Sequence, residues 1–457
     1  MNPDLVLDTI GFSAEGRAIP LVAFNASVQR QDQPMLTILI TAEQHGDEPA
    51  AMEGVLRLIA DLAHHKMDYL KSNVALYIAP QINPDGAEKG TRRNGNNADL
   101  NRDHLILMQP ETQALYAYFR AIRIDVNYDV HEYPVDDHSA AQPYYRSTEM
   151  QLGVGTNLNI SKDMRGFMRQ HLLPAMGDSM SKAGFTFGEY IVGDWSKEAF
   201  LRHSTVDIDD GRHGFGVLGS LCFIAEGLNG AFPAEREERR TAAQYTLLRS
   251  FLKMANDTKE NRRWLRLSLR EHHRIVHGKQ QVHIRMEHHS SGRKWPLRLR
   301  QAGAAKDTLL TYSNYNDHVE SALTVQKPLG YLIHPEDTLL VAWLRRQGVH
   351  PLPLQSLDPK LQSKVSASCF AYVLAPLETA VNENMKVPNY HISFEKVVPS
   401  NTLLFVDLRA QAFASNPWSS SISHKLILAL EPNSMFGIWR YDTFAPLREQ
   451  LRLWRIQ

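Results

Sequence analysis

Cysteine is scarce in this sequence. Only Cys222 and Cys369 occur among 457 residues, and they lie far apart along the chain. Two widely separated cysteines imply no disulfide framework, which in small secreted domains is built from several closely spaced cysteines. The composition therefore fits a reducing compartment and excludes the class of small disulfide-stapled proteins.

Long hydrophobic runs are also missing. A membrane-spanning helix needs about 18 or more consecutive apolar residues, and no run in the chain approaches that length. The first residues, MNPDLVLDTIGFSAEGR, lack the basic and apolar segments of a signal peptide. We therefore expect no membrane span and no membrane partner. The expected location is the cytoplasm, or the periplasm if an export signal has been removed.

An excess of charge of either sign is absent. Lys and Arg together number 50, which equals the number of Asp and Glu. A protein that binds nucleic acid is expected to carry a basic face or stripe, so no nucleic-acid partner is predicted. The length suggests about two or three domains. Nothing in the composition predicts the oligomeric state.

The first part of the chain alternates between strand-like and helix-like segments. Short apolar runs such as LTILI (36–40), VALYIA (74–79) and LCFIA (221–225) are typical of buried strands. After Pro49, which suits a first helical turn, apolar residues recur every three or four positions, at Met52, Val55, Leu56, Ile59 and Leu62. This alternation predicts an α/β fold with a mixed, mostly parallel central sheet and helices on both faces.

Further helices are predicted over residues 111–122, 161–183 and 236–256. Pro174 should kink or break the second of them, because proline lacks the N–H of the helical hydrogen bond. We divide the chain into a first domain, residues 1–260, and a smaller α+β accessory region, residues 261–457.

The accessory region begins with a basic, histidine-rich stretch. Residues 262–300 are interpreted as a solvated linker with surface strands, and a cationic binding patch is the alternative. Farther on, GYLIHP (330–335) and DTLLVAWLRRQGV (337–349) predict a strand followed by a short helix. NTLLFVDL (401–408) and KLILALEP (425–432) predict two more strands, or a strand and a helix. We find no catalytic constellation in this region.

Side chains that bind metals follow several of the apolar runs. LTILI leads to His45 and Glu48, the segment ending at Val130 leads directly to His131, and LCFIA leads directly to Glu226. The carboxyl ends of neighbouring strands in an open α/β sheet line one crevice. Two histidines and a glutamate are the ligand set of a hydrolytic zinc, with a fourth position left for water.

Each of these residues also has an ordinary structural interpretation. With 20 histidines in the chain, one such pair is expected by chance, and Glu48 would also suit a first helical turn as an acid that complements the helix dipole. His131 would serve as a structural residue at a strand end. Glu226 would serve as a salt-bridged acid at the rim, or as a general base whose pKa is raised by partial desolvation.

A polar stretch follows the strand VALYIA and the turn NPDG. It reads TRRNGNNADLNRD (91–103) and is dense in arginine and asparagine. Guanidinium groups bind carboxylates through two parallel hydrogen bonds. An ordinary polar loop is the alternative, but a loop this long after a strand that ends at the same crevice favours a binding role.

Taken together, these motifs resemble the zinc carboxypeptidases of the carboxypeptidase A/B type. HGDE, NPDG, the spacing from Arg92 to ADLNR, DVHE and the late Glu226 occur in the family's order, over roughly residues 10–255. The similarity is greatest to bacterial members related to murein peptide amidases. The resemblance covers the first domain, residues 1–260, which it identifies as a carboxypeptidase-like catalytic domain.

The resemblance implies a role for each site residue. It implies one Zn²⁺ per chain, held by His45, Glu48 and His131, and it makes Glu226 the general base. Arg92 would polarise the scissile carbonyl, while Asn101 and Arg102 would bind the terminal carboxylate of the substrate. Asp99 would orient a ligand histidine from behind. The family's active-site tyrosine has no counterpart in the loop RHSTVDIDDGRHGFG, and Tyr133 and Tyr190 are the alternatives.

The predicted function is that of a zinc metallocarboxypeptidase, a hydrolase and protease. Its substrate would be a peptide or amide with a free carboxylate, which includes cell-wall peptides. One alternative is an N-acyl amino acid deacylase of the aspartoacylase and succinylglutamate desuccinylase type, which would use the same metal and base. Another is a catalytically silent peptide-binding protein that has kept the cleft.

Overall fold

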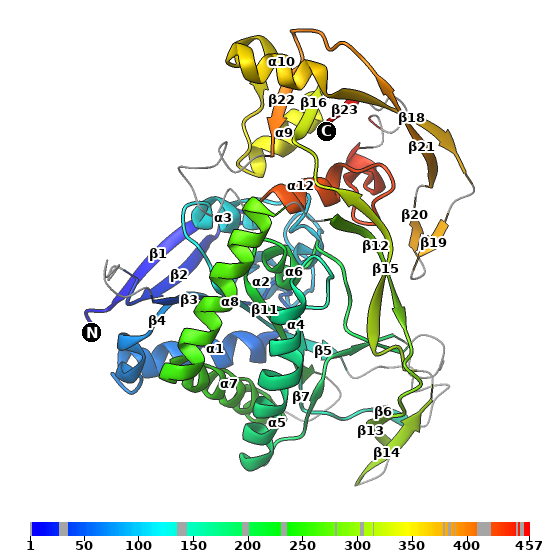
Figure 1. Cartoon of the computed structure of the whole chain (residues 1–457). Helices are drawn as coiled ribbons and strands as arrows, with labels where there is room; N and C mark the ends of the chain where they lie inside the picture. The colour runs from blue at the N-terminus through cyan, green and yellow to red at the C-terminus, as the bar shows by residue number, and fades with distance from the viewer. Residues whose placement is uncertain are drawn as a thin grey trace.

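The structure is a computed structural model of the whole chain (Figure 1). It describes residues 2–26, 35–134, 144–193, 201–229, 235–278, 281–301, 306–313, 315–377, 380–382, 385–387, 389–408, 422–444, 447 and 452–457. Within these residues, no helix combines the length and the apolar character needed to cross a bilayer.

A central sheet of eight strands has the order β1-β2-β4-β3-β5-β11-β7-β8. Its four middle strands, β4, β3, β5 and β11, run parallel to one another. The pairs β1–β2, β2–β4 and β11–β7 are antiparallel, and β7–β8 is parallel. The predicted mixed, mostly parallel sheet is confirmed. The bounds are β1 Leu5–Phe12, β2 Ala18–Phe24, β3 Leu36–Ala42, β4 Val74–Ala79, β5 Val126–Pro134, β7 Met150–Val154, β8 Phe187–Glu189 and β11 Leu221–Asn229.

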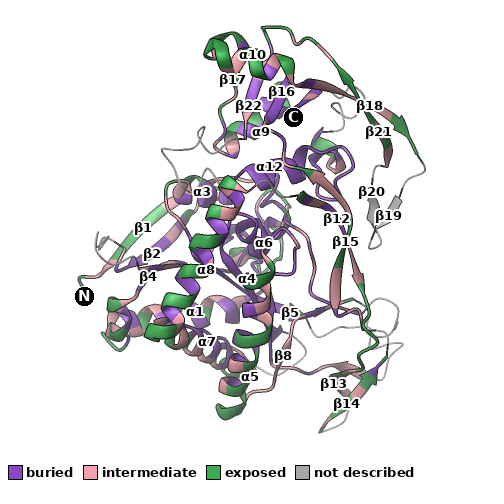
Figure 2. Ribbon diagram, in the orientation of Figure 1, coloured by how far each residue is buried: buried purple, intermediate pink, exposed green. Residues whose placement is uncertain are grey.

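Both faces of the middle strands of this sheet are buried, whereas the edge strand β1 is largely exposed (Figure 2). Along β3, Ile38 and Ile40 pack into one apolar cluster and Leu39 packs into another, as the two-residue period of a strand requires. The first cluster includes side chains of α1 (Pro49–Ala63), α4 (Lys162–Phe167), α5 (Leu173–Lys182) and α7 (Glu235–Asn256). The second includes side chains of α3 (Pro110–Phe119) and α6 (Gly211–Gly216). The predicted helices on both faces are therefore present.

The predicted helix over 161–183 is interrupted before its proline. A π-helical segment, Met168–Leu172, separates α4 from α5, and Pro174 lies in the first turn of α5. Proline provides no N–H for the helical hydrogen bond, and such irregular turns are a usual way to accommodate the loss. The expected interruption is confirmed.

The stretch after residue 260 is not a linker, which corrects the sequence interpretation. Helix α8 runs without a break over Thr258–His277, and the buried indole of Trp264 lies 5.0 Å from the ring of Phe251. Its charged residues occupy the outer face of an amphipathic helix, which explains why the stretch looks solvated in the sequence. The strand that follows, β12 (Gln281–His289), pairs with β15 (His318–Gln326). The boundary predicted at residue 260 lies within α8, and the division into two domains stays a prediction.

The rest of the accessory region forms a second layer, which contains both strands and helices. GYLIHP contains β16 (Gly330–Ile333), the following segment forms α9 (Thr338–Arg346), and NTLLFVDL contains β22 (Leu404–Asp407). KLILALEP forms mostly helix, α12 (Ile422–Leu430). A six-stranded sheet joins β17 (Leu352–Pro353), β22, β16, β23 (Leu453–Ile456), β18 (Cys369–Pro376) and β21 (Tyr390–Lys396), and α10 (Pro359–Ala367) accompanies it.

The accessory region packs on the face of the central sheet that carries Leu39, the face covered by α3 and α6. Trp343 of α9 and Leu426 of α12 belong to the same buried cluster as Leu39 of β3. In addition, β13 (Trp295–Gln301) pairs with β14 (Asp307–Tyr312) and with β6 (Tyr144–Arg146) of the first domain. The two parts of the chain therefore share both a core and a small sheet.

Candidate metal centre

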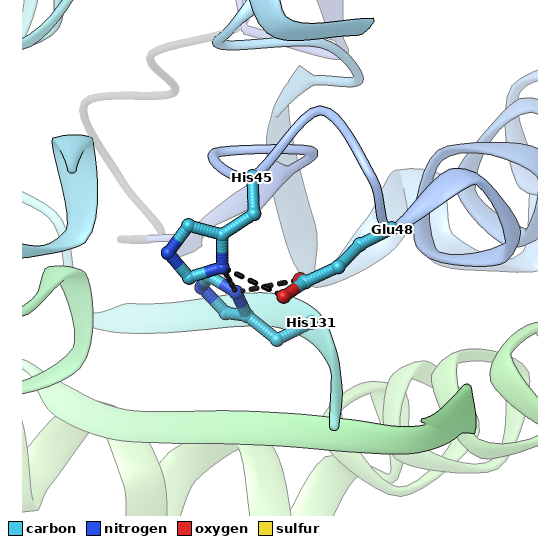
Figure 3. Close-up of side chains that lie close together, drawn as sticks. All are labelled: His45, Glu48 and His131. Carbon is cyan, nitrogen blue, oxygen red and sulfur yellow. Dashed lines mark hydrogen bonds and ion pairs between the residues drawn. The ribbon is translucent and has the colours of Figure 1, made fainter. Parts of the chain in front are cut away.

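His45, Glu48 and His131 converge at the carboxyl end of the central sheet (Figure 3). The Nδ1 atom of His45 lies 2.7 Å from one carboxylate oxygen of Glu48, and the Nδ1 atom of His131 lies 2.9 Å from the other. The two Nδ1 atoms are 3.2 Å apart. All three side chains are buried. Two imidazole nitrogens and a carboxylate that face one point form a ligand set suited to zinc.

The turn between β3 and α1 presents two of these ligands. Strand β3 ends at Ala42 and α1 begins at Pro49, so Glu48 is the N-cap residue of the helix. Its side chain makes no capping hydrogen bond to the helix, and the carboxylate is directed toward the histidines. Glu48 is therefore more than an acid that complements the helix dipole, because its carboxylate contacts both histidines.

Two glycines bring the motifs HGDE and NPDG together. A Cβ atom added at Gly46 would lie 2.0 Å from the carbonyl carbon of Gly86, so only glycine fits at this close backbone approach. Asn83 of the same turn caps α2 (Pro84–Lys89) and donates from Nδ2 to the carbonyl oxygen of Gln44 at 3.1 Å. The turn NPDG therefore braces the segment that carries the ligands.

Each ligand histidine is held from behind by an aspartate. The Nε2 atom of His45 lies 3.1 Å from Asp99, and the Nε2 atom of His131 lies 3.0 Å from Asp129. A carboxylate behind a ligand imidazole fixes its tautomer and its orientation. The sequence predicts this position for Asp99 but misses Asp129. The sequence does carry a signal for Asp129, namely its spacing of two residues from His131 in the same strand. Alternate residues of a strand share one face, so the two side chains point the same way.

Negative charge accumulates around the histidines. Burial opposes protonation of His131, but the carboxylates of Asp129 and Glu48 outweigh it and hold its pKa well above the ordinary value. Burial likewise opposes protonation of His45, and Glu48 and Asp99 raise its pKa. A buried site that stabilises a proton in this way also favours a divalent cation, which binds in place of the proton. The residues present therefore fit a zinc ion.

Glu226 lies beside the three ligands. On β11 it is paired in register with His131 of the neighbouring parallel strand β5. Burial raises the pKa of its carboxyl group to about 7, and the charge of Glu48 adds to this while His131 opposes it. A carboxylate with a pKa near neutrality is suited to accept and return protons.

Arg92 lies at the exposed side of the ligands. Its Nε atom donates to Asp99 at 3.1 Å, and its Nη1 atom lies 3.2 Å from the Nδ1 atom of His45. Its side chain is 43% exposed, so part of the guanidinium faces the solvent. Asp99 therefore contacts both a metal ligand and this arginine.

Asn101 and Arg102 lie on the same loop, where Asn101 is buried and Arg102 is exposed. Asn101 accepts a hydrogen bond from the backbone N–H of Gly211 at 2.7 Å, and its Nδ2 atom lies 3.4 Å from the Nε2 atom of His131. Arg102 donates from Nη1 to the carbonyl oxygen of Asn101 at 2.6 Å. Although burial opposes it, the carboxylates of Asp209 and Asp99 hold the pKa of Arg102 above its usual value. Arg102 therefore stays charged.

A cavity of about 210 Å³ joins these side chains. Among the residues that the sequence predicts, it is lined by His45, Glu48, Arg92, Asn101, Arg102 and Glu226. Both alternative tyrosines, Tyr133 and Tyr190, also line it, and the hydroxyl of Tyr133 donates to the carbonyl oxygen of Thr148. Further charged lining residues, Arg146, Asp207, Asp210 and Arg212, were not predicted, because they come from segments without a motif.

A larger cavity of about 310 Å³ lies elsewhere, between α7 and β13. Its three arginines are each paired with an acid, in Arg239–Glu149, Arg240–Glu132 and Arg300–Asp307. The charges in this cavity are therefore already compensated, and the site at His45 and His131 is the better candidate for chemistry.

Residues 1–146 match the protein family of the zinc carboxypeptidases. These residues contain His45, Glu48 and His131, whereas Glu226 lies beyond them. Among curated proteins, the probable carboxypeptidase 2 of Trichophyton verrucosum is 25% identical over 423 residues, which is 87% of this chain and 80% of that protein. Carboxypeptidase SOL1 of Arabidopsis thaliana is 38% identical over 124 residues, 22% of this chain and 25% of the relative.

Other matches are partial. Carboxypeptidase 2 of Trichophyton rubrum is 27% identical over 253 residues, 54% of this chain, and the match spans 47% of the relative. The chain thus spans about half the length of that relative. A solved structure, the metallo-carboxypeptidase from Burkholderia cenocepacia, is 20% identical, covers 55% of this chain and 64% of its own, and superposes with a TM-score of 0.41.

Proposed function

We propose that this chain, whose residues 1–146 match the zinc carboxypeptidases, is a zinc-dependent hydrolase that cleaves the peptide or amide bond next to a free terminal carboxylate. The observation that carries this proposal is one cavity lined by His45, Glu48, Glu226 and Arg102. A metal ligand set, a carboxyl group with a pKa near 7 and the charged guanidinium of Arg102 thereby face the same space.

His45, Glu48 and His131 would hold the zinc ion. When bound, zinc supplies a Lewis acid that polarises the scissile carbonyl and lowers the pKa of water. Asp99 and Asp129 support this role, because their contacts with the Nε2 atoms leave the Nδ1 atoms of the two histidines facing Glu48, where the ion would be held.

Glu226 is proposed as the general base and acid. Its carboxylate accepts a proton from the attacking water molecule and returns it to the nitrogen of the leaving amine. A carboxyl group with a pKa of about 7 has both forms available near neutral pH. The position of Glu226 next to His131 in the sheet supports the assignment.

Arg92 is proposed to donate to the carbonyl oxygen as negative charge develops on it. Its guanidinium is anchored by Asp99 and lies beside His45, and part of it faces the cavity. A donor held in place before the reaction stabilises the developing oxyanion without reorganisation. The contact therefore strengthens in the transition state.

Arg102 and Asn101 are proposed to bind the terminal carboxylate of the substrate. Arg102 keeps donors beyond the one bonded to the carbonyl oxygen of Asn101, since a guanidinium carries five N–H groups. Such a group binds a carboxylate through two hydrogen bonds. The choice of a cell-wall peptide as the natural substrate stays a prediction, as does the cytoplasmic location, or the periplasmic one after removal of an export signal.

The experiment that tests this function measures metal content and hydrolysis together. Purified protein should contain one zinc ion per chain and should cleave a chromogenic peptide with a free C-terminus. Acyl amino acids should be poor substrates, because the comparisons favour the carboxypeptidases over the deacylase alternative. Protein that neither contains nor takes up zinc would refute the proposal.

A further inference from the structure

Resting on the proposed function of this site, we propose that the accessory region is part of the substrate-binding machinery. Its residues Lys425, Gln347 and Tyr441 position two loops of the first domain that surround Arg102. The first loop, residues 99–107, carries Asn101 and Arg102, and we call it the arginine loop. The second, residues 204–211, carries Asp207, Asp209 and Asp210, and we call it the aspartate loop.

The accessory region contacts the arginine loop just after Arg102. Lys425 of α12 donates from Nζ to the carbonyl oxygen of His104 at 2.6 Å. The next carbonyl, that of Leu105, accepts from Gln347 Nε2 at 2.6 Å and from Trp343 Nε1 at 3.1 Å. Three donors from the accessory region thus hold two successive backbone carbonyls of this loop.

These contacts are too costly to be incidental packing. The side chains of Lys425 and Trp343 are 0% exposed, and Gln347 is 8% exposed. Burying a lysine side chain away from water is unfavourable unless its nitrogen is hydrogen-bonded, and burial lowers the pKa of Lys425 to about 7. An interface that only joined two domains would be more stable with an apolar residue there. Besides the His104 carbonyl, Lys425 has the ring of Tyr116 at 4.1 Å. The lysine therefore fixes the position of this loop.

The accessory region also contacts the aspartate loop. The hydroxyl of Tyr441 donates to Oδ2 of Asp209 at 3.0 Å. The backbone carbonyl of Asp209 accepts a hydrogen bond from the N–H of His104 on the arginine loop at 3.1 Å, and the carboxylate of Asp209 favours the charged form of Arg102. The tyrosine thereby holds the acid that balances the charge of the proposed carboxylate-binding residue.

The two loops are joined to each other. The backbone N–H of His104 donates to the carbonyl oxygen of Asp209 at 3.1 Å, and that of Gly211 donates to Oδ1 of Asn101 at 2.7 Å. A shift of either loop therefore moves Asn101 and Arg102. Lys425, Gln347 and Tyr441 act on substrate only through these loops and are positioning residues.

The test measures peptide binding separately from turnover. In the Glu226→Gln protein, calorimetry gives the Kd of a peptide with a free C-terminus and of the same peptide amidated. Adding Tyr441→Phe removes one hydrogen bond to a carboxylate, and the free-acid peptide should bind about three- to tenfold more weakly, while the Kd of the amidated peptide stays unchanged. Lys425→Met should produce the same selective loss. This second variant tests the proposal if Tyr441→Phe does not fold.

Tyr372→Phe is the matched control. The hydroxyl of Tyr372 also donates to a carboxylate, that of Glu431 at 3.0 Å, but both residues lie within the accessory region. This variant should bind both peptides as the parent does. Unchanged binding of the free acid in Tyr441→Phe and Lys425→Met, or equal weakening for both peptides, would overturn the proposal. If the wild type hydrolyses neither peptide but the selective loss is seen, the proposed function fails and the positioning role stands.

Discussion

Glu226 and His131 occupy paired positions on adjacent parallel strands, β11 and β5, at the end of the sheet where the metal ligands gather. Parallel neighbours in register present their side chains on the same face. The proposed base and a proposed zinc ligand are therefore fixed relative to each other by backbone hydrogen bonds, and not by a mobile loop.

Replacing Glu226 with glutamine should separate catalysis from metal binding. Glu226→Gln keeps the size of the side chain but cannot accept a proton, so kcat should fall by about 100- to 10,000-fold. Zinc content, measured by metal analysis of the same preparation, should stay at the wild-type level, because the three proposed ligands remain. Loss of zinc in this variant would make Glu226 a ligand and would require a new assignment of the site.

The pH dependence of the reaction should show the titration of Glu226. The base works when deprotonated, and its pKa is raised to about 7 by burial. The value of kcat/KM should therefore be high above the pKa and fall as the pH drops below it. The positive charge of a bound zinc ion would move this midpoint lower. A profile that stays flat as the pH falls to about 5 would contradict the role of Glu226.

The aspartate behind His131 should tune zinc affinity. Asp129→Asn removes the negative charge that faces Nε2 of His131, and zinc affinity should fall by about 10- to 100-fold. Competition with a chelator measures this loss, and His131→Ala should abolish binding altogether. Asp125→Asn is a suitable control, because Asp125 is equally buried but precedes β5 at its amino end, where it bonds to Ser268, to Arg123 and to the backbone of Thr37. Equal zinc affinity in Asp129→Asn and wild type would refute the supporting role.

Arg92 should act mainly on turnover. Arg92→Ala removes a donor whose contact strengthens as the oxyanion forms, so kcat should fall by about 100- to 1,000-fold with a smaller change in KM. Steady-state kinetics on a free-acid peptide measures both constants. Arg93→Ala is the control, since Arg93 on the same loop bonds to the carbonyl oxygen of Asn97 and lies outside the lining of the cavity. A change confined to KM would assign Arg92 to ground-state binding instead.

Much of the site can be predicted from the sequence, because its residues follow strands or belong to compact motifs. His131 and Glu226 directly continue apolar runs, and HGDE lies between a strand and a helix with Pro49 at its start. The sheet is likewise predictable, since its middle strands are buried on both faces and appear as short apolar runs.

Other parts depend on contacts that no local pattern records. The basic stretch after residue 260 was misinterpreted because the charged outer face of α8 masks its buried residues, Trp264 and Ile275. Lys425 is part of an apolar helix and is hydrogen-bonded to His104, more than 300 positions earlier in the chain. Pairings over such distances arise from tertiary packing, so the link between the accessory region and Arg102 becomes visible only in the structure.

The most direct test of the account compares hydrolysis of one peptide in two forms, with a free C-terminus and amidated, by the zinc-loaded wild type. The account predicts a strong preference for the free acid, because Arg102 binds a carboxylate through two hydrogen bonds. Arg102→Lys should lose much of this preference, with KM for the free acid raised roughly tenfold. Equal cleavage of both forms by the wild type would contradict the account, and it would favour an amidase or an endopeptidase on the same metal site.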